Sequence, residues 1–252
     1  MRRKENIMAG KTENIVAIRP IVKKEVKVKI VGDSPLITHC WDAKAKRQIL
    51  EKELGIKAVR GAEKEKKDPV ADFAASMYWL DPMPSVLTKD SVNEAIANGA
   101  RFGFPLTGIK QAAISSAFRM GWSKDKMSLR GAFFILPDFN GYYAGDLVIS
   151  DDRKSVEIVP NAFHPEPMIE IHAESVTMRE DMVKVGMGAA DIRYRGQFNN
   201  WWAEFTISYN ENGDKTVDEI LTILNAGGYV CGLGEWRPER DGQYGMYHVE
   251  LG

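Results

Sequence analysis

The alternation of apolar and charged residues near the start of the chain predicts a β-strand. Val26, Val28 and Ile30 occupy every second position, and charged residues lie between them, which is typical of a strand with one buried face. The Gly-Asp-Ser-Pro run at 32–35 then ends this strand. Residues 1–22 have no sustained periodicity, and we predict that they form a flexible basic arm.

Helical periodicity follows over residues 41–121. Asp42 is a candidate N-cap, and Asp68-Pro69 combines an N-cap residue with proline at the first helical position. A Lys/Glu-rich linker at 56–67 separates these two starts. We expect helices over 42–54, 69–80, 92–98 and 104–119, the last of them ended by Gly121. Together they form a helical insertion at about 41–121.

The second half of the chain is dominated by strand patterns. Strands are expected over 130–136, 146–149, 155–159, 168–177, 191–198 and 201–209. Asn199-Asn200 is a candidate two-residue hairpin turn between the last two. Thr216 and Glu219 form a capping box for a helix that Gly227-Gly228 would end, and two further strands would follow it. This β-β-α-β-β ending indicates a single α+β domain over 23–252.

Composition narrows the class of protein. The 252 residues are 44% apolar and 27% charged, with no apolar run near the roughly 18 residues of a membrane span. No apolar signal-peptide core follows the basic start. Cys40 and Cys231 form no CxxC pair, and the four histidines have no metal-type spacing. We therefore expect a cytoplasmic protein without metal, cofactor or membrane contact.

Charge is distributed unevenly along the chain. The net charge is −1, yet residues 1–67 hold 18 Lys and Arg against 9 Asp and Glu. The remaining 185 residues hold 16 against 26. This asymmetry predicts either a basic face for a polyanion or a solvated basic tail.

The run Gly232–Met246 combines glycine, arginine and aromatic residues in a way that suits nucleic acid. Glycines allow a close backbone approach, arginines grip phosphates, and aromatic rings stack on bases. The candidate binding residues here are Gly232, Gly234, Trp236, Arg237, Arg240, Gly242, Tyr244 and Gly245. The alternative is a structural hairpin in which Trp236 and Arg237 pack on the protein itself.

Three further segments are candidates for phosphate contacts. At the start of the 104–119 helix, Thr107 and Gly108 would admit a phosphate to free backbone N–H groups, and Lys110 would add charge. A basic helical face would carry Lys44, Lys46 and Arg47. Arg193 and Arg195 share one face of a strand. They would either bind the phosphate backbone of a nucleic acid or pair with Glu204 across the sheet. The alternative for each lysine is a solvated helix surface.

The residues at 104–112, Phe-Pro-Leu-Thr-Gly-Ile-Lys-Gln-Ala, are similar to the Pro-Gly-Ser-Ser-Leu-Lys-Gly helix start of the RAMP superfamily of CRISPR-associated RNA-binding proteins. The chain also resembles this family in its order of parts: a first strand, Ser34-Pro35-Leu36, the lysine-bearing helix and a C-terminal glycine-rich loop. It departs from the family in carrying Leu-Thr-Gly-Ile where the family has Gly-Ser-Ser-Leu. The Gly-Glu-Trp-Arg-Pro run resembles phage-encoded proteins, and the two resemblances together imply the cytoplasm of a bacterial or phage-infected host cell.

The resemblance implies a ferredoxin-like, RNA-recognition-type core with a helical insertion and extra β-hairpins. It also implies non-catalytic, sequence-independent binding of RNA or single-stranded DNA, with copies assembling as a homo-oligomer along the strand. Nothing in the sequence identifies a reader of the ribose 2′-hydroxyl, so RNA and DNA are not distinguished.

Two other functions remain open. Some members of the family cleave RNA with an aspartate after the first strand, where this chain has Asp33, and His39 is a second candidate for an endoribonuclease. The third alternative is a phage structural or protein-interaction protein, in which the glycine-rich loop has only an architectural role.

Overall fold

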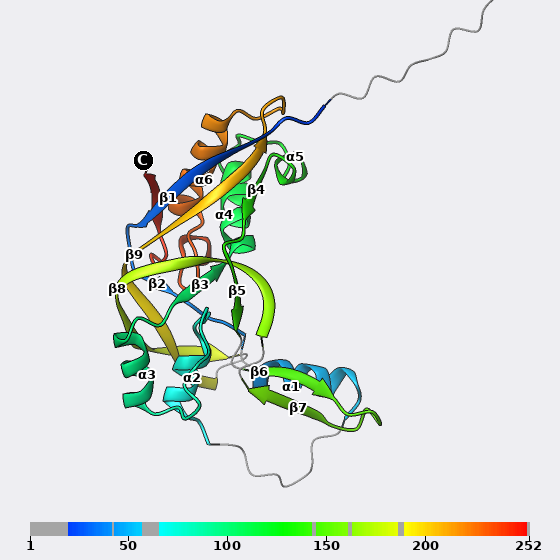
Figure 1. The fold of residues 1–252 in the computed structure, drawn as a ribbon, viewed down its shortest axis with the longest axis vertical. Helices are drawn as coiled ribbons and strands as arrows, with labels where there is room; N and C mark the ends of the chain where they lie inside the picture. Colours follow the sequence, from blue (N-terminus) through cyan, green and yellow to red (C-terminus); the bar gives the residue numbers. More distant parts are fainter. Residues whose placement is uncertain are drawn as a thin grey trace, which may run out of the picture.

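The computed structural model describes residues 20–41, 43–56, 66–142, 145–160, 163–185 and 189–250. Nearly all of the predicted arm at 1–22, the candidate cap Asp42 and most of the 56–67 linker lie outside them. In the described residues the fold is mixed α+β, with a mostly antiparallel sheet and six α-helices (Figure 1). None of the described helices is long and apolar enough to cross a membrane.

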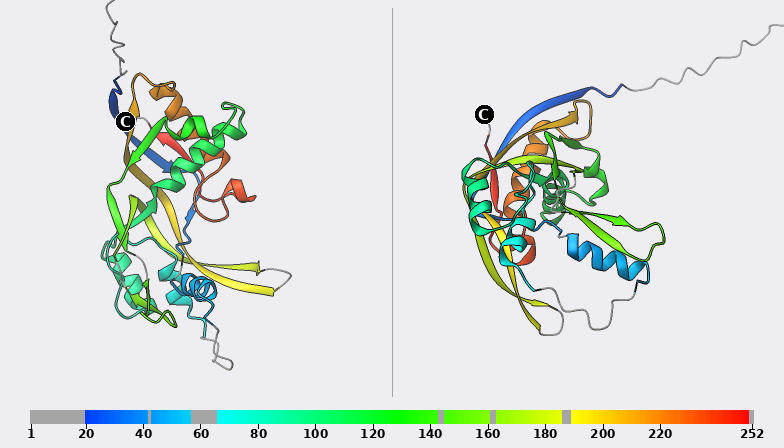
Figure 2. Two further views of the ribbon diagram at one scale, coloured as in Figure 1. Left: turned by 90° about the vertical axis from the view of Figure 1, so that its right-hand side faces the viewer. Right: turned by 60° about the horizontal axis from the view of Figure 1, so that its bottom comes forward.

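The main sheet is built around two long strands. β8 (Phe163–Val185) and β9 (Ala189–Asn210) pair antiparallel and project beyond the body of the molecule as a curved ribbon (Figure 2). The path continues from β9 to β1 (Lys23–Gly32) and β10 (Tyr247–Glu250), and from β8 to β3 (Phe102–Pro105). Three short strands join this sheet: β2 (Leu36–Ile37), β4 (Phe133–Leu136) and β5 (Phe139–Tyr142).

The helices divide into a core pair and a peripheral set. α4 (Leu106–Arg119) and α6 (Val217–Val230) pack against each other. The other helices are α1 (Ala43–Glu53), α2 (Pro69–Ala75), α3 (Lys89–Ala97) and α5 (Met127–Arg130). α1 lies against a separate two-stranded sheet of β6 (Gly145–Ile149) and β7 (Val156–Pro160), at the lower right of Figure 1.

One apolar core joins the sheet to the α4–α6 pair. Ile109 from α4 and Leu224 from α6 are fully buried in it, as are Ile30 from β1 and Trp201 from β9. Burial of each large apolar side chain contributes about 1.5–3 kcal/mol relative to exposure. The alternation predicted for the first strand is therefore confirmed, because its apolar positions face this core.

Helix starts predicted from capping residues are confirmed. Asp68 accepts hydrogen bonds from the backbone N–H groups of Val70 and Ala71, and Thr216 with Glu219 forms the capping box of α6. Helix ends were predicted less well. α2 ends at Ala75 rather than near 80, because the chain turns there and Trp79 bridges to Phe102.

The predicted stop at Gly227-Gly228 is wrong. α6 continues through both glycines to Val230, and both are buried. A Cβ at Gly227 would lie 2.9 Å from the backbone nitrogen of Ala113, and one at Gly228 would collide with the carbonyl of Tyr247. The glycines therefore let α6 approach α4 and β10 closely, and this packing offsets the roughly 1 kcal/mol that each glycine costs in a helix.

The hairpin predicted at Asn199-Asn200 is also wrong. β9 runs straight through the pair, with Asn199 opposite Ser175 and Trp201 opposite Ala173. Asn200 has φ 48°, and its side-chain amide donates to Glu174 at 2.7 Å. Asparagine tolerates this conformation better than most residues, so the same chemistry that favours a turn here produces an irregularity within a strand.

The segment after α6 is one loop followed by one strand, not the two predicted strands. Residues 231–246 form an irregular loop containing the short 3₁₀ helix η1 (Pro238–Arg240), and β10 follows it. The predicted β-β-α-β-β ending is therefore corrected to the single long strand β9, a helix, a loop and the single strand β10.

Candidate nucleic-acid interface

The terminal loop at 231–246 folds back on the chain near β2. Its backbone is fixed by Glu235 N–H donating to the Ile37 carbonyl at 2.9 Å and Gly245 N–H donating to the Pro35 carbonyl at 2.8 Å. Gly234 and Gly245 have φ values of 70° and 65°, and a Cβ on Gly234 would collide with the Ile37 carbonyl. These glycines thus serve close approach to the protein's own backbone.

The same holds for the other two glycines of the loop. Gly232 has φ 67°, and a Cβ there would lie 2.7 Å from the Pro238 ring. A Cβ on Gly242 would collide with the carbonyl of Trp236. All four glycines therefore shape the loop itself, which leaves contacts with a ligand to its side chains.

Of the two arginines and two aromatic residues of the loop, two are held inward and two are exposed. Arg237 donates to the Gly234 carbonyl at 2.8 Å and to the Glu239 carboxylate at 3.0 and 3.2 Å. The Tyr244 hydroxyl accepts from Arg179 at 3.1 Å, and the Arg179 guanidinium lies over its ring. Arg240 is exposed, and 39% of Trp236 is exposed at φ 52°.

The start of α4 is divided between two sides of the molecule. Gly108 faces the terminal loop, whereas the Lys110 ammonium lies 4.2 Å from the centre of the Phe134 ring on β4. Burial lowers the pKa of Lys110. Thr107 is exposed. The three residues predicted as one phosphate site therefore do not converge, and only Gly108 lines a cleft with the loop.

That cleft, named here the loop cleft, measures about 180 Å³. It is lined by His39, Tyr78, Phe104, Gly108, Gln111, Ala112, Gly232, Leu233, Gly234, Glu235, Arg237 and Glu239. The structure thus brings together two segments that the sequence singled out separately, the helix start at Gly108 and the glycine-rich loop. The lining holds one arginine, Arg237, against the two carboxylates Glu235 and Glu239, so the loop cleft by itself carries no net positive charge.

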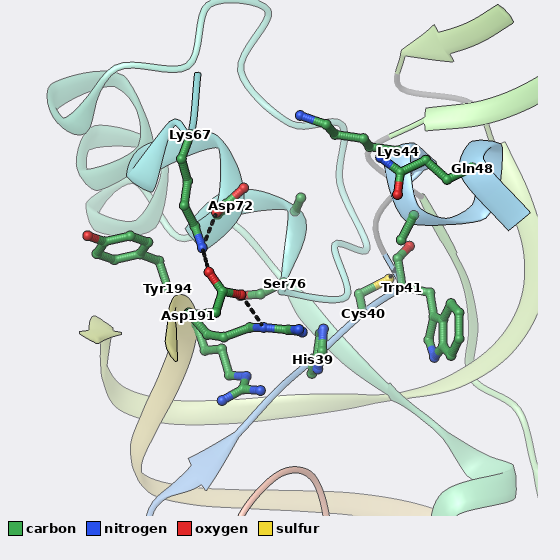
Figure 3. A pocket seen from close by; sticks show the side chains of 14 residues that line it. His39, Cys40, Trp41, Lys44, Gln48, Lys67, Asp72, Ser76, Asp191 and Tyr194 are labelled. Atoms are coloured by element: carbon green, nitrogen blue, oxygen red, sulfur yellow. Dashed lines mark hydrogen bonds and ion pairs between the residues drawn. The ribbon is translucent and has the colours of Figure 1, made fainter. Parts of the chain in front are cut away.

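A larger cavity, named here the charged cavity, adjoins it and measures about 420 Å³. It is lined by His39, Cys40, Trp41, Lys44, Ala45, Gln48, Lys67, Asp72, Ala75, Ser76, Asp191, Arg193, Tyr194 and Arg195 (Figure 3). These residues come from β9, the start of α1, α2 and the segments before α1 and α2. His39 lines both spaces, so the loop cleft and the charged cavity meet at this residue, and the two together are named here the groove.

Ion pairs organise the outer wall of the charged cavity. Lys67 lies 2.7 Å from Asp191 and 4.0 Å from Asp72, and Arg193 donates to the other oxygen of Asp191 at 3.1 Å. Lys67 and Arg193 together hold the pKa of the Asp191 carboxyl below its usual value. Asp191 is 37% exposed, so each pair contributes less than about 1 kcal/mol to stability.

A buried ion network lies at the junction of the two spaces. Arg195 is 5% exposed, donates to Asp181 at 3.2 Å and lies 3.4 Å from Glu235. Asp181 also accepts from Arg179 at 2.8 Å. His39 lies 3.5 Å from Glu235, and its hydrogen bond together with Arg195 lowers the pKa of Glu235 against the effect of desolvation.

Several sequence-predicted residues are separated from this groove or differ from expectation. Of the three basic residues predicted in α1 only Lys44 lines it, whereas Arg47 lies 3.6 Å from Glu51, and the charge of Lys46 acts on Glu166. The pairing of Arg193 and Arg195 with Glu204 is wrong, because the position opposite Glu204 is Lys29. Asp33 lies at the end of β1, 2.7 Å from His248.

The sequence interpretation missed Trp41, Lys67 and Asp181. Trp41 is 60% exposed at the rim of the charged cavity, beside His39. Lys67 was assigned to a linker, and its approach to Asp191 spans 124 positions of the chain. The available signal was the alternation of Asp191, Arg193 and Arg195, which indicated a charged strand face but not its partners.

No protein-family model matches this chain, and no curated protein matches it significantly. Among the described residues no group of three or more His, Cys, Asp or Glu side chains is arranged to hold a metal ion.

Proposed function

We propose that this protein binds RNA or single-stranded DNA in the groove formed by the loop cleft and the charged cavity, without sequence preference and without cleaving it. The observation that carries the proposal is that the two spaces meet at His39, with cationic side chains in their lining and exposed tryptophans beside them. Basic grooves with aromatic stacking platforms are typical of single-strand binding.

The cations along the groove favour a polyanion over a neutral ligand. Lys44, Lys67, Arg193 and Arg195 line the charged cavity, and Arg237 lines the loop cleft. Arg240 is exposed next to the cleft. Their positive charge is partly compensated by carboxylates within the protein, so we expect modest affinity that depends strongly on salt.

Two exposed indole rings favour single strands over duplexes. Trp41 is 60% exposed and Trp236 is 39% exposed, and Trp236 lies between the lining residues Glu235 and Arg237. A base can stack on such a ring only when it is not already stacked within a duplex. This chemistry is common to all bases and carries no sequence information.

The order of elements supports assignment of a ferredoxin-like core and kinship with the RAMP superfamily. Four strands lie in the order β10-β1-β9-β4, each antiparallel to its neighbour. α4 lies between β1 and β4 in the chain, and α6 lies between β9 and β10. This is the β-α-β-β-α-β arrangement, with further elements inserted. By the same resemblance, we propose that copies assemble side by side along the strand.

Fluorescence anisotropy with labelled 20-nucleotide RNA, single-stranded DNA and duplex DNA tests the proposal. We expect both single strands to bind more tightly than the duplex, and the affinity to fall steeply as salt rises. Mixed-sequence and homopolymer oligonucleotides should bind with similar affinity. A flat salt response, or no binding at low salt, would leave the groove with an architectural role or a protein ligand.

An endoribonuclease is the second candidate, and the observation that favours it is the position of His39. This histidine lies at the junction of the two spaces, beside the Glu235 carboxylate. A carboxylate-oriented imidazole in such a groove can act as a general base on a ribose hydroxyl. Cleavage of bound RNA that His39→Ala abolishes, while binding persists, would replace the non-catalytic proposal; Asp33→Ala provides the matched test of the other predicted residue.

A further inference from the structure

The charged cavity combines features that a strand-binding groove does not require. It is lined by four cationic side chains, Lys44, Lys67, Arg193 and Arg195, against the two carboxylates Asp72 and Asp191. The cations come from three separate segments: α1, the segment before α2, and β9. Its volume of about 420 Å³ is within the range of pockets that hold a small ligand.

Donors in this cavity have unused hydrogen-bonding capacity. Asp191 accepts from both Lys67 and Arg193, so one carboxylate serves two cations. Among the described residues, Arg193 uses only its Nε, and its two terminal nitrogens have no partner. The Nε of Arg195 also has no partner within this part of the chain, but this atom is fully buried, so Arg195 adds positive charge to the cavity without offering a donor to a ligand. An incoming oxyanion would accept hydrogen bonds from the terminal nitrogens of Arg193.

The opposite side of the cavity offers a planar apolar surface. Trp41 lies across the cavity from Lys67 and Asp191, with His39 and Cys40 between them (Figure 3). Its ring is 60% exposed, and the neighbouring lining includes Ala45. A ligand that fills the cavity therefore needs an aromatic ring at one end and an anion at the other.

We propose that the charged cavity binds a nucleoside monophosphate group, with its base stacked on Trp41 and its phosphate bound by Lys67 and Arg193. This chemistry is shared by a free nucleotide and by the phosphorylated terminal nucleotide of a bound strand. In the second case the inference rests on the function proposed above, and the cavity would position the end of the strand.

Isothermal titration of the full-length protein with AMP, UMP, adenosine and inorganic phosphate tests the ligand class. Both nucleotides should bind, and adenosine and phosphate should each bind at least about tenfold more weakly, because each lacks one half of the ligand. Trp41→Ala and Arg193→Ala should each weaken AMP at least about fivefold. Trp122→Ala and Arg130→Ala, exposed residues outside the lining, should leave AMP affinity unchanged.

Oligonucleotides with and without a terminal phosphate separate the two sources. If the cavity holds a strand end, a 5′- or 3′-phosphate increases the affinity of the oligonucleotide, and added AMP abolishes this increase. If it holds a free nucleotide, AMP binds with no effect on oligonucleotide affinity. Failure of AMP to bind, together with equal affinity for oligonucleotides with and without the terminal phosphate, overturns the inference. Salt-dependent oligonucleotide binding that persists in that case would leave the proposed function intact.

Discussion

The terminal loop and the β9 wall of the charged cavity face the same groove but differ in what fixes them. The loop is held by backbone hydrogen bonds and by glycines with positive φ, and its side chains Arg240 and Trp236 remain exposed. The β9 wall, residues 191–195, lies on the β8–β9 strand pair and is held by charges, with Arg195 on β9 and its partner Asp181 on β8 almost completely buried. The loop is therefore shaped by sterics and the wall by electrostatics.

This difference separates residues that maintain the groove from residues free to bind. Glycines and buried ions cannot contact a ligand without first breaking the contacts that hold them. Exposed aromatic rings, and guanidinium groups that still have free N–H donors, can contact a ligand with little loss of stability. We therefore expect stability defects from changes to the first group and binding defects from changes to the second.

The largest expected effect is on the wall. Asp181→Asn should cost about 3–5 kcal/mol in the free energy of unfolding, because it leaves Arg195 buried without its nearest carboxylate. Asp191→Asn is the matched control, since this carboxylate is 37% exposed and its change should cost less than about 1 kcal/mol. Urea unfolding followed by circular dichroism measures both. Equal effects of the two changes would mean that burial does not distinguish them.

A smaller loss of stability is expected in the loop. Gly234→Ala should cost about 3 kcal/mol, because it adds strain at φ 70° to a collision with the Ile37 carbonyl. Gly121→Ala is the control: its φ is 73°, but no atom lies within 4 Å of the added Cβ, so only about 1–2 kcal/mol of strain remains. If both variants unfold at the same urea concentration, the loop does not pack as described.

Binding should respond to the exposed loop side chains with little change in stability. Trp236→Ala should weaken single-strand binding by about 1–3 kcal/mol if a base stacks on the ring. Arg240→Ala should lower the salt slope by about one, since it removes one phosphate contact. Anisotropy titrations at several salt concentrations measure both, with Trp122→Ala as the control. A large drop in melting temperature with unchanged binding would assign Trp236 to the architecture.

The smallest effect is a pH dependence at the junction of the two regions. The pKa of Glu235 is lowered from the ordinary value of 4.5, first by its hydrogen bond to His39 and also by Arg195. Its contribution to stability is therefore fully present above about pH 4.5 and is lost as pH falls through the lower folded-state pKa. Melting temperatures between pH 3 and 6 should show this loss in the unmodified protein and a flatter profile in Glu235→Gln. If the melting temperatures of the unmodified protein and of Glu235→Gln change with pH in the same way, Glu235 is not the source of the pH dependence.

Local signals in the sequence predicted the elements whose cause is local. The alternation at Val26–Ile30, the N-cap Asp68 and the capping box at Thr216 depend on neighbouring residues and are found in the structure. Gly227-Gly228 and Asn199-Asn200 misled for the opposite reason. Their conformations are set by Ala113, Tyr247 and the β8 partner strand, which no local pattern describes.

The groove was predictable only in part. The sequence singled out Gly108 and the glycine-rich loop, and the structure places both at one cleft. It could not relate Lys67 to Asp191, or Arg195 to Glu235, because these pairs depend on how β9 folds against α2 and the loop. The sequence also led to the prediction that the loop glycines allow close approach of a ligand's backbone. In the structure they allow close approach of the protein's own backbone instead.

Photo-crosslinking of a bound oligonucleotide tests the central claim, that single strands lie in the groove, most directly. A 20-nucleotide RNA with 4-thiouridine at every third position would be irradiated with the protein, and the attached peptides identified by mass spectrometry. We predict crosslinks at the segments that contain Trp41 and Trp236. Crosslinks confined to the opposite region of the sheet, around Trp202 and Phe134, would contradict the account.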